Sequence, residues 1–580
     1  MEDKTIVQLI AIAIFIYVTS HLLSPPTPHK SPVLRSVAIL VLGDIGRSPR
    51  MMYHAESFAK NDYETFLVGY PGSKPIPSLL SLPHIHFLYL SSPPKPLTHL
   101  PFLLSAPIKI TLQIISVLSA LLIRIPQPPE FILVQNPPSI PTLALVWLVG
   151  WLRGSKIIID WHNLGYSILA LKLGPDHLLV RISKWFEATF GRSAYAHLFV
   201  TNAMHDHLIK EWDLQGHKAV LHDRPPSHFR PTEPPEMHDL FLRLQKNPTL
   251  SSLHTFFPSY TLPYSTPFTT TTTSASSPTP RSQNPLRPIP STSQTLSSPQ
   301  TINPATPRPD RPALLITSTS WTPDEDFSLL IQALKLYEMR ARVINRHRVG
   351  DGEGRKRVLP KVLMVVTGKG PLKERYMREV EMLQSGDGEN EDRWEWVRCI
   401  SLWLEAEDYP VLLGWPLTSN SSLEHRTLIP PNFHTGSADL GICLHSSSSA
   451  LDLPMKIVDM FGCGLPVCAL KFACLNELVK DGTNGLVFTS PAELSQQIER
   501  LLTSFPSPHG ALANFRTSLL EMSRPSSTPF PTVDPSITTD TNIPGEGDHW
   551  EWNSWDDNWN KIVRPLVLRD ANGYHDEWVM

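Results

Sequence analysis

The chain has 580 residues, a length that predicts more than one hydrophobic core. Its 51 basic and 54 acidic residues leave a net charge of -3, which excludes the basic surface typical of nucleic-acid-binding proteins, so we expect no nucleic-acid partner. The 58 prolines indicate linkers and inserts beside the globular parts. The five cysteines contain no CxxC pair, a pattern that favours buried free thiols over a disulfide framework or a zinc site.

The N-terminus predicts a membrane anchor at residues 1–30. Residues 5–23, TIVQLIAIAIFIYVTSHLL, are about one bilayer long and carry no charge apart from the titratable His21. A signal peptide is the alternative, but the basic n-region and the small-residue cleavage site are lacking. Basic residues follow the segment, so the positive-inside rule predicts a single-pass protein with its bulk in the cytosol.

Residues 31–235 are predicted to form a first α/β domain. Continuous apolar runs, typical of strands buried on both faces, alternate with helical segments and indicate a parallel, doubly wound sheet. Residues 102–125 are a second apolar segment, which fits a membrane span and a helix lying on the membrane equally well. The predicted strands are 37–43, 65–69, 86–90, 131–135, 156–160, 197–201 and 218–221, and the predicted helices include 50–60 and 178–191.

A second α/β domain is predicted at residues 313–505. It is preceded by a Ser/Thr/Pro-rich insert at 245–312, which we expect to be disordered because it offers little apolar surface to bury. Residues 340–360 and 385–405 look like charged excursions between elements. Another linker is expected at 506–545, followed at 546–580 by a tryptophan-rich helix that docks on a domain surface.

The loop after the first strand, GDIGRSPR, is a candidate phosphate-binding loop. Backbone amides of Gly43 and Gly46 at a helix N-terminus, with the charges of Arg47 and Arg50, suit a phosphate or a pyrophosphate. Asp44 argues against a simple phosphate nest, and an ordinary crossover glycine is the alternative.

The sequence DWHN, at the end of a later predicted strand, holds a second candidate. Ligands bind at the carboxyl ends of parallel strands, where an imidazole such as that of His162, beside Asp160, suits general acid–base work. A structural histidine is the alternative. Glu187, on the following helix, is either functional or a solvated charge.

Two loops of the second domain follow strands and precede helices. Ser320, in TSTSWTPDEDF, could contact a nucleotide diphosphate, while Asp324 there is a candidate helix cap. Gly368 and Gly370, in TGKGP, lie in a strand-to-helix turn that resembles the GxGP turn of GT-B nucleotide domains, where the backbone approaches the nucleobase or ribose. An ordinary tight turn is the alternative.

The segment LDLPMKIVDMFGCGLPV carries the strongest pattern. A proline begins a helix on which Lys456 and Asp459, three residues apart, share one face, and Asp452 lies just before it. This arrangement resembles the donor-binding signature of GT-B glycosyltransferases, where an acid contacts the ribose or sugar and nearby amides and a cation hold the diphosphate. An ordinary helix-turn-strand is the alternative.

Together these motifs resemble the GT-B glycosyltransferases, and in combination they are similar to the chitobiosyldiphosphodolichol β-mannosyltransferase family of the dolichol pathway. The resemblance rests on GDIGRSPRMMYHA, DWHNLGYSIL, SWTPDEDFSLL, GKGPLKERY, LGWP and SALDLPMKIVDMFGCGLPV. It implies two doubly wound Rossmann-like domains facing a cleft, in a protein of the endoplasmic-reticulum membrane. The insert at 245–312 departs from the compact family pattern.

The resemblance implies transfer of mannose from GDP-mannose to GlcNAc2-diphosphate-dolichol with inversion, forming a β1,4 bond. Retaining GT-B relatives carry glutamates where this chain has aspartates near Asp452 and at Asp459, a departure that favours inversion. His162 and Asp44 are the two candidate bases, and the sequence does not choose between them.

The remaining roles follow the same resemblance. Other early dolichol-pathway glycosyltransferases are possible partners. No metal-ligand spacing is present, so we assign no metal site and no tightly bound cofactor, and Mg²⁺ would act only by screening the diphosphates. The alternatives are a membrane-associated GT-B enzyme with another sugar nucleotide and a non-catalytic scaffold subunit. Donor binding is assigned to Lys456, Asp459, Asp452, Gly368, Gly370 and Ser320, and acceptor or diphosphate binding to Gly43, Gly46, Arg47 and Arg50.

Overall fold

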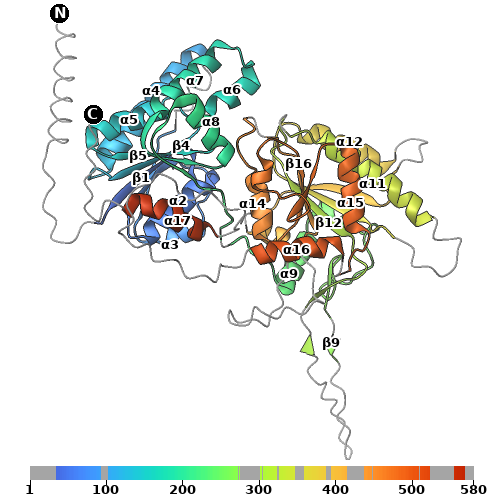
Figure 1. Ribbon diagram of the computed structural model, residues 1–580. Helices are drawn as coiled ribbons and strands as arrows, with labels where there is room; N and C mark the ends of the chain where they lie inside the picture. Colours follow the sequence, from blue (N-terminus) through green and yellow to red (C-terminus); the bar gives the residue numbers. More distant parts are fainter. Residues whose placement is uncertain are drawn as a thin grey trace, which may run out of the picture. The chain divides into compact units, whose positions relative to one another are not determined.

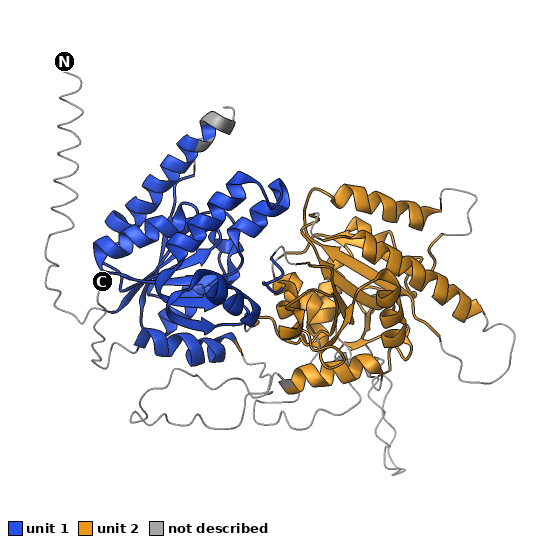
Figure 2. Ribbon diagram, turned by 45° about the horizontal axis from the view of Figure 1, so that its top comes forward, with its two compact units in different colours: residues 1–223, 448–453, 555–580 blue, residues 224–447, 454–554 orange. Residues whose placement is uncertain are grey.

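The computed structural model divides the chain into two compact units, coloured separately in Figure 2. The first comprises residues 1–223, 448–453 and 555–580, and the second comprises 224–447 and 454–554. The anchor predicted at 1–30 lies outside the described residues. The structure describes residues 34–92, 102–226, 228–271, 273–274, 301–302, 305–322, 325–346, 358–386, 393–405, 407–414, 437–446, 449–507, 510–522 and 554–568.

The first unit contains a seven-stranded parallel sheet in the order β3-β2-β1-β4-β5-β6-β7. Alternate residues of β1 face two separate cores, which is the pattern of a strand buried on both faces. The strands are β1 (Ser36–Asp44), β2 (Glu64–Tyr70), β3 (Ile85–Tyr89), β4 (Phe131–Asn136), β5 (Lys156–Trp161), β6 (Ser193–Phe199) and β7 (Gln215–Val220).

Helices cover both faces of this sheet (Figure 1). One core is closed by α2 and α17, and the other by α4, α5 and α8. The helices are η1 (Ile45–Arg47), α2 (Pro49–Lys60), α3 (Pro77–Ser81), α4 (Phe102–Ser119) with the π-helical turn Ala120–Arg124, α5 (Thr142–Arg153), α6 (Gly165–Leu173), α7 (Leu178–Gly191), α8 (Asn202–Trp212) and α17 (Trp555–Leu568).

The second unit contains a six-stranded parallel sheet in the order β14-β13-β12-β15-β16-β17. The strands are β12 (Ala313–Ser318), β13 (Val362–Thr367), β14 (Val397–Leu402), β15 (Leu440–Cys443), β16 (Val467–Leu470) and β17 (Gly485–Phe488). The helices are α9 (Pro234–Leu244), α10 (Pro248–Ser251), α11 (Ser328–Arg346), α12 (Lys373–Ser385), α13 (Asp408–Leu413), α14 (Met455–Gly462), η6 (Leu475–Glu477), α15 (Pro491–Leu502) and α16 (Ala511–Met522).

Both sheets reverse their strand order beside the first strand, between β1 and β4 and between β12 and β15. This is the doubly wound Rossmann arrangement, in which ligands bind at the carboxyl ends of the strands next to the reversal. The prediction of two doubly wound, Rossmann-like domains is therefore confirmed.

The prediction that residues 245–312 are disordered is wrong for their first part. Phe256, Phe257 and Phe268 are buried, and the ring of Phe268 stacks on Phe241 of α9 with 4.2 Å between centroids. His238 of α9 adds a 2.7 Å hydrogen bond between its Nδ1 and the hydroxyl of Thr269. Three phenylalanines supply the apolar surface that the Ser/Thr/Pro composition obscures.

Short paired strands also lie in this segment. Strand β8 (Thr269–Thr270) pairs with β11 (Thr306–Pro307), and β9 (Thr273–Ser274) pairs with β10 (Thr301–Ile302). The N-terminal stretch of the first unit ends at Asp223, so the predicted domain boundary at residue 235 lies too late in the chain.

Two elements lie in segments that were predicted to be irregular. Strand β14 lies in the segment taken as a charged excursion, where Val397, Cys399, Ile400 and Leu402 are buried and only Arg398 and Ser401 are partly exposed. Helix α16 lies in the segment taken as a linker, and its buried Arg516 reaches Asp439 at 3.3 Å. Asp439 also pairs with Arg311 at 2.7 Å, so this helix is fixed by a buried charge cluster that only the folded chain assembles.

Helix α17 packs on α2 within the first unit. Trp555 and Trp559 are buried in the α2 core, and Tyr63 and Tyr195 donate hydrogen bonds to the main-chain carbonyls of Val567 and Leu566. Trp550 and Trp552 lie outside the described residues. The C-terminal helix is therefore a structural part of the first unit.

Candidate active site

Lys456, in the first turn of α14, points back to the end of β12. Its Nζ donates to the carbonyl of Ser318 at 2.8 Å and also contacts the carboxylate of Glu325. Glu325 is buried and accepts hydrogen bonds from the hydroxyl of Thr319 and, at 3.0 Å, from the amide of Ser320. A buried carboxylate needs such partners, so Glu325 joins the loop after β12 to α14.

Glu325 is the residue of this site that sequence reasoning missed. Of the three acids in the sequence DED, only Asp324 was given a role, as a candidate helix cap, and it lies outside the described residues. The sequence signal that could have pointed to Glu325 was the cation Lys456 on a predicted helix. The side chain of Lys456 is 17% exposed, and a cation with so little contact with water is stabilised by a carboxylate partner.

Gly368 and Gly370 are required by the protein backbone itself. Gly368 has φ of 120°, and a Cβ there would lie 1.9 Å from the carbonyl oxygen of Thr319. A Cβ on Gly370 would lie 1.7 Å from the carbonyl oxygen of Ser320. The loops after β12 and β13 therefore pack backbone against backbone, so the two glycines shape the loop that presents Ser320, which is exposed.

Asp459 lies one turn after Lys456 on α14. Burial, and next the charge of Asp459, raise the pKa of Tyr409, whose hydroxyl lies 2.9 Å from that of Ser318. Asp459 therefore lies on the same helix as Lys456 and acts electrostatically on Tyr409, whose hydroxyl contacts Ser318. Asp452 falls within the first compact unit, so its assignment to the donor stays a prediction.

In the first unit, Asp44 organises the loop after β1. Its carboxylate accepts hydrogen bonds from the amide of Gly46 at 3.0 Å and from the amide and hydroxyl of Ser73 at 2.8 and 2.9 Å. Partial burial acts in the opposite direction, but the hydrogen bonds from Ser73 and Gly46 lower the pKa of Asp44. Arg47 lies 3.6 Å from this carboxylate and is exposed.

The two glycines of this loop differ. A Cβ on Gly46 would lie 2.4 Å from the carbonyl oxygen of Ser73, so the fold requires glycine there. A Cβ on Gly43 would meet only Val41, at 4.0 Å, so no described part of the protein excludes a side chain there. The presence of glycine at position 43 would therefore be explained by a bound group that approaches the backbone closely.

The prediction that Arg50 binds a diphosphate is not supported by its position. The side chain is 3% exposed, and its guanidinium donates to Asp160 at 2.8 and 2.9 Å and to Asp223 at 2.7 Å. A fourth hydrogen bond joins it to the carbonyl of Leu221 at 2.8 Å. The guanidinium is therefore occupied by the protein and has no exposed face for an anion.

His162 follows β5 and is oriented by Asp160. The carboxylate of Asp160 lies 2.8 Å from Nε2 of His162, whose side chain is 20% exposed while that of Asp160 is fully buried. Burial raises the pKa of Asp160, but the interactions with Arg50 and His162 outweigh burial and hold this pKa well below its usual value. An ionised carboxylate here fixes the proton on Nε2 and leaves the Nδ1 lone pair available as a base.

Glu187 is neither solvated nor part of the Asp160 cluster. It is buried and accepts hydrogen bonds from the side chain of Asn136 at 3.2 Å and from the amides of Gly165 and Tyr166 at 2.8 and 3.3 Å. It caps the first turn of α6, and burial raises its pKa. It therefore holds the loop that follows His162.

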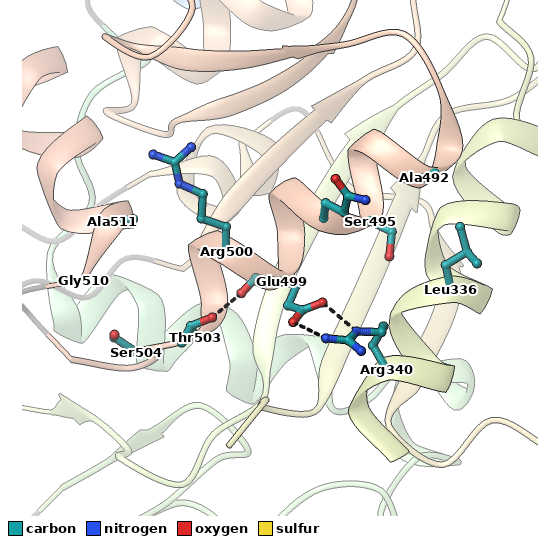
Figure 3. A pocket seen from close by; sticks show the side chains of 11 residues that line it. Leu336, Arg340, Ala492, Ser495, Glu499, Arg500, Thr503, Ser504, Gly510 and Ala511 are labelled. Carbon is teal, nitrogen blue, oxygen red and sulfur yellow. Dashed lines mark hydrogen bonds and ion pairs between the residues drawn. The ribbon is translucent and has the colours of Figure 1, made fainter. Parts of the chain in front are cut away.

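A separate pocket of about 770 Å³ lies in the second unit between α11 and α15 (Figure 3). None of the residues that line it is among the candidate residues. Its central charges, Arg340 and Glu499, pair with each other at 3.1 Å. Because these two charges neutralise each other, they do not indicate a charged ligand, and we assign no ligand to this pocket.

The described residues contain no group of three or more His, Cys, Asp or Glu side chains that could hold a metal ion. All five cysteines lie among them as buried free thiols, and burial raises the pKa of Cys443 to about 11. These thiols therefore stay protonated near neutral pH and are poor nucleophiles.

Comparison with known proteins agrees with this arrangement. Residues 434–504, which include Lys456 and Asp459, match the family model described as "Glycosyl transferases group 1". The chitobiosyldiphosphodolichol beta-mannosyltransferases of mouse and human are 37% and 38% identical to this chain, over 92% of it and 89% and 93% of their own lengths. A protein of Arabidopsis thaliana named UDP-glycosyltransferase TURAN is 38% identical over 83% of this chain and 92% of its own. By this similarity along nearly the whole chain, the protein belongs to the chitobiosyldiphosphodolichol β-mannosyltransferase family.

Proposed function

We propose that this protein transfers mannose from GDP-mannose to GlcNAc2-diphosphate-dolichol with inversion, forming Man-β1,4-GlcNAc2-diphosphate-dolichol. The observation that carries the proposal is the pairing of His162 with the buried Asp160 at the carboxyl end of a strand, in a chain of this family. The donor carries mannose as an α-glycoside, so a β product requires one displacement with inversion.

His162 is the general base of this displacement. Its Nδ1 removes the proton from the 4-hydroxyl of the terminal GlcNAc as the bond from that oxygen to C1 of mannose forms and the bond from C1 to the diphosphate oxygen breaks. Asp44 is the weaker candidate, because its carboxylate is engaged by Gly46 and Ser73 and its pKa is lowered. Asp44 instead shapes the loop whose Gly43 amide and Arg47 guanidinium bind the acceptor diphosphate.

Lys456 stabilises the leaving GDP. Its ammonium has three protons, and Ser318 and Glu325 engage two of them, so one remains for a phosphate oxygen. Asp459, on the same face of α14, binds a hydroxyl of the mannose or the ribose, and Ser320 contacts the diphosphate from the loop after β12. We assign no residue to the nucleobase.

The test is transfer of labelled sugar to a lipid-linked GlcNAc2-diphosphate by membranes that contain the full chain. GDP-mannose, UDP-GlcNAc and UDP-glucose are supplied separately, because one relative is named as a UDP-glycosyltransferase. A β1,4-mannosylated product from GDP-mannose alone supports the proposal. Transfer from a UDP-sugar would favour the alternative enzyme, and failure with every donor would favour a scaffold subunit.

The donor-site assignment predicts a separable effect of Lys456. Lys456→Met is expected to raise KM for GDP-mannose about 10- to 100-fold, the cost of a charge-assisted hydrogen bond. Because this change leaves the buried carboxylate of Glu325 without its cation, the double variant Lys456→Met/Glu325→Gln is measured beside it. The double variant should recover thermal stability but not donor affinity, and Lys335→Ala, on the exposed face of α11, should change neither. Recovery of donor affinity in the double variant would contradict the assignment.

We further propose that the protein resides in the endoplasmic-reticulum membrane, with residues 1–30 as a single-pass anchor and both units in the cytosol. Among the described residues one helix, at 107–124, is long and apolar enough to cross a membrane, and 17% of it is buried. Exposed apolar side chains continue on the neighbouring helices, including Trp151 of α5 and Trp185 of α7, which are 71% and 62% exposed. This surface supports contact of the first unit with lipid, where a dolichol-linked acceptor is met.

This placement predicts a lipid-dependent defect. Ile115, 58% exposed on α4, is replaced by lysine, and KM for a dolichol-linked acceptor in vesicles is expected to rise about three- to tenfold. A short-chain acceptor dispersed in detergent should show no change. Leu80→Lys on α3, at a site 65% exposed, is the control and should match wild type with both acceptors. An equal loss with both acceptors would refute the membrane contact.

A further inference from the structure

Several donors converge on Asp160 in the first unit. Nε of Arg50 and Nε2 of His162 each lie 2.8 Å from its Oδ2, and Nη2 of Arg50 lies 2.9 Å from Oδ1. Nε2 of His54, from α2, lies 3.2 Å from the same Oδ2. The carboxylate that orients His162 is therefore itself positioned by α2.

The tautomer of His54 is fixed by the C-terminal helix. Nε1 of Trp559, on α17, donates a hydrogen bond to Nδ1 of His54 at 3.1 Å. An indole N–H can only donate, so Nδ1 must accept and the imidazole proton must lie on Nε2, which faces Asp160. Both side chains are 0% exposed, and burial lowers the pKa of His54, which keeps it neutral.

Packing holds this imidazole in place. The ring of Trp555, also on α17, meets the His54 ring edge-on, with 5.1 Å between centroids, and lies 5.4 Å from the guanidinium carbon of Arg50. The indole of Trp555 donates to the hydroxyl of Ser57 at 3.0 Å, so its hydrogen bond does not involve Asp160.

The charged groups around Asp160 come from few elements. Helix α2 provides Arg50 and the neutral His54, the loop after β5 provides His162, and Asp223 lies across Arg50 after β7. Helix α17 presents two neutral indoles to this group. A change at Trp559 therefore acts on Asp160 through His54.

We propose that Trp559 and His54 are positioning residues for the transfer reaction. Through the hydrogen bond from Trp559 to His54 and the 3.2 Å contact between Nε2 of His54 and Asp160, the C-terminal helix sets the orientation and the effective charge of the carboxylate that aligns His162. This inference rests on the proposed function, because it assigns the chain to a base that accepts the proton of the acceptor hydroxyl.

The test is Trp559→Phe in the full chain, with Tyr195→Phe as the matched control. Both changes remove one hydrogen bond between α17 and the rest of the first unit, but only Trp559 bonds to His54. Trp559→Phe is expected to lower kcat about 5- to 20-fold with little change in KM for GDP-mannose, the size of effect of a lost supporting hydrogen bond.

The pH–rate profile distinguishes positioning from simple loss of stability. Without the hydrogen bond from Trp559, the proton of His54 is no longer held on Nε2, the atom that faces Asp160. The negative charge of Asp160 is then less compensated, so it holds a proton on the imidazole of His162 more strongly. The acidic limb of the profile for Trp559→Phe should therefore move to higher pH, whereas that of Tyr195→Phe should coincide with wild type even if both lose the same thermal stability. A profile for Trp559→Phe that coincides with wild type would overturn the inference.

A second pair of variants carries the test if Trp559→Phe does not fold. His54→Gln retains an acceptor and a donor on one side chain, and His54→Phe retains neither. The glutamine variant should keep kcat within about tenfold of wild type, and the phenylalanine variant should lose about 100-fold. Equal losses in both would refute the positioning role, whereas a wild-type chain that transfers no mannose would refute the proposed function instead.

Discussion

His162→Ala is expected to lower kcat for mannose transfer by about 10²- to 10⁴-fold, the range of a lost general base, with KM for GDP-mannose nearly unchanged. The expectation follows from geometry, since Asp160 fixes the proton on Nε2 of His162 and leaves Nδ1 to accept the proton of the acceptor hydroxyl. The measurement is initial rates at saturating acceptor, with the residual rate followed as a function of pH.

Two comparisons make this result specific. His84→Ala, a partly exposed histidine of the same unit, should leave the rate unchanged. Asp44→Asn should weaken the loop held by Ser73 and lower the rate far less than His162→Ala, because Asp44 acts there as a structural acceptor. A full loss in Asp44→Asn with a small loss in His162→Ala would exchange the two roles and make Asp44 the base.

The sheets could be predicted from sequence because buried parallel strands appear as uninterrupted apolar runs. The runs at β1, β5, β12 and β13 belong to this class, and the loops that follow them were correctly identified as the places where polar side chains gather. Strand β14 was missed because Arg398 and Ser401 interrupt its apolar run and charged residues flank it. Apolar runs therefore predicted the buried central strands and their ends, but they did not predict the less apolar edge strand β14.

The partners of buried charges could not be predicted from sequence. Arg50 and Asp160 lie 110 positions apart, and Lys456 and Glu325 lie 131 positions apart, so neither pair leaves a local spacing signal. For the same reason an arginine beside a glycine loop was interpreted as a ligand for phosphate. Glu187 was missed in the same way, because its role as the cap of α6 depends on a contact across 22 residues.

Arg50→Met is expected to lower the free energy of unfolding by about 3–5 kcal/mol, the cost of removing one partner from a buried ion pair. The change leaves the carboxylates of Asp160 and Asp223 close together without their shared cation. In the wild type, burial opposes ionisation of Asp160, but Arg50 and His162 hold its pKa low. This carboxylate therefore stabilises the fold above the ordinary pKa of aspartate, and that stability is lost as the pH falls through the lowered pKa.

The loss of unfolding free energy in Arg50→Met should itself depend on pH. Without Arg50 the pKa of Asp160 rises, so protonation relieves the uncompensated charge, and the gap between variant and wild type should be largest near pH 7 and smaller near pH 5. Urea unfolding of the detergent-solubilised chain at these two pH values measures it. Arg47→Met is the matched control, because Arg47 is exposed beside the same loop. It should leave stability within about 0.5 kcal/mol of wild type and raise KM for the lipid-linked acceptor. Were Arg50 instead a ligand of the diphosphate, Arg50→Met would reproduce the acceptor defect of Arg47→Met without loss of stability.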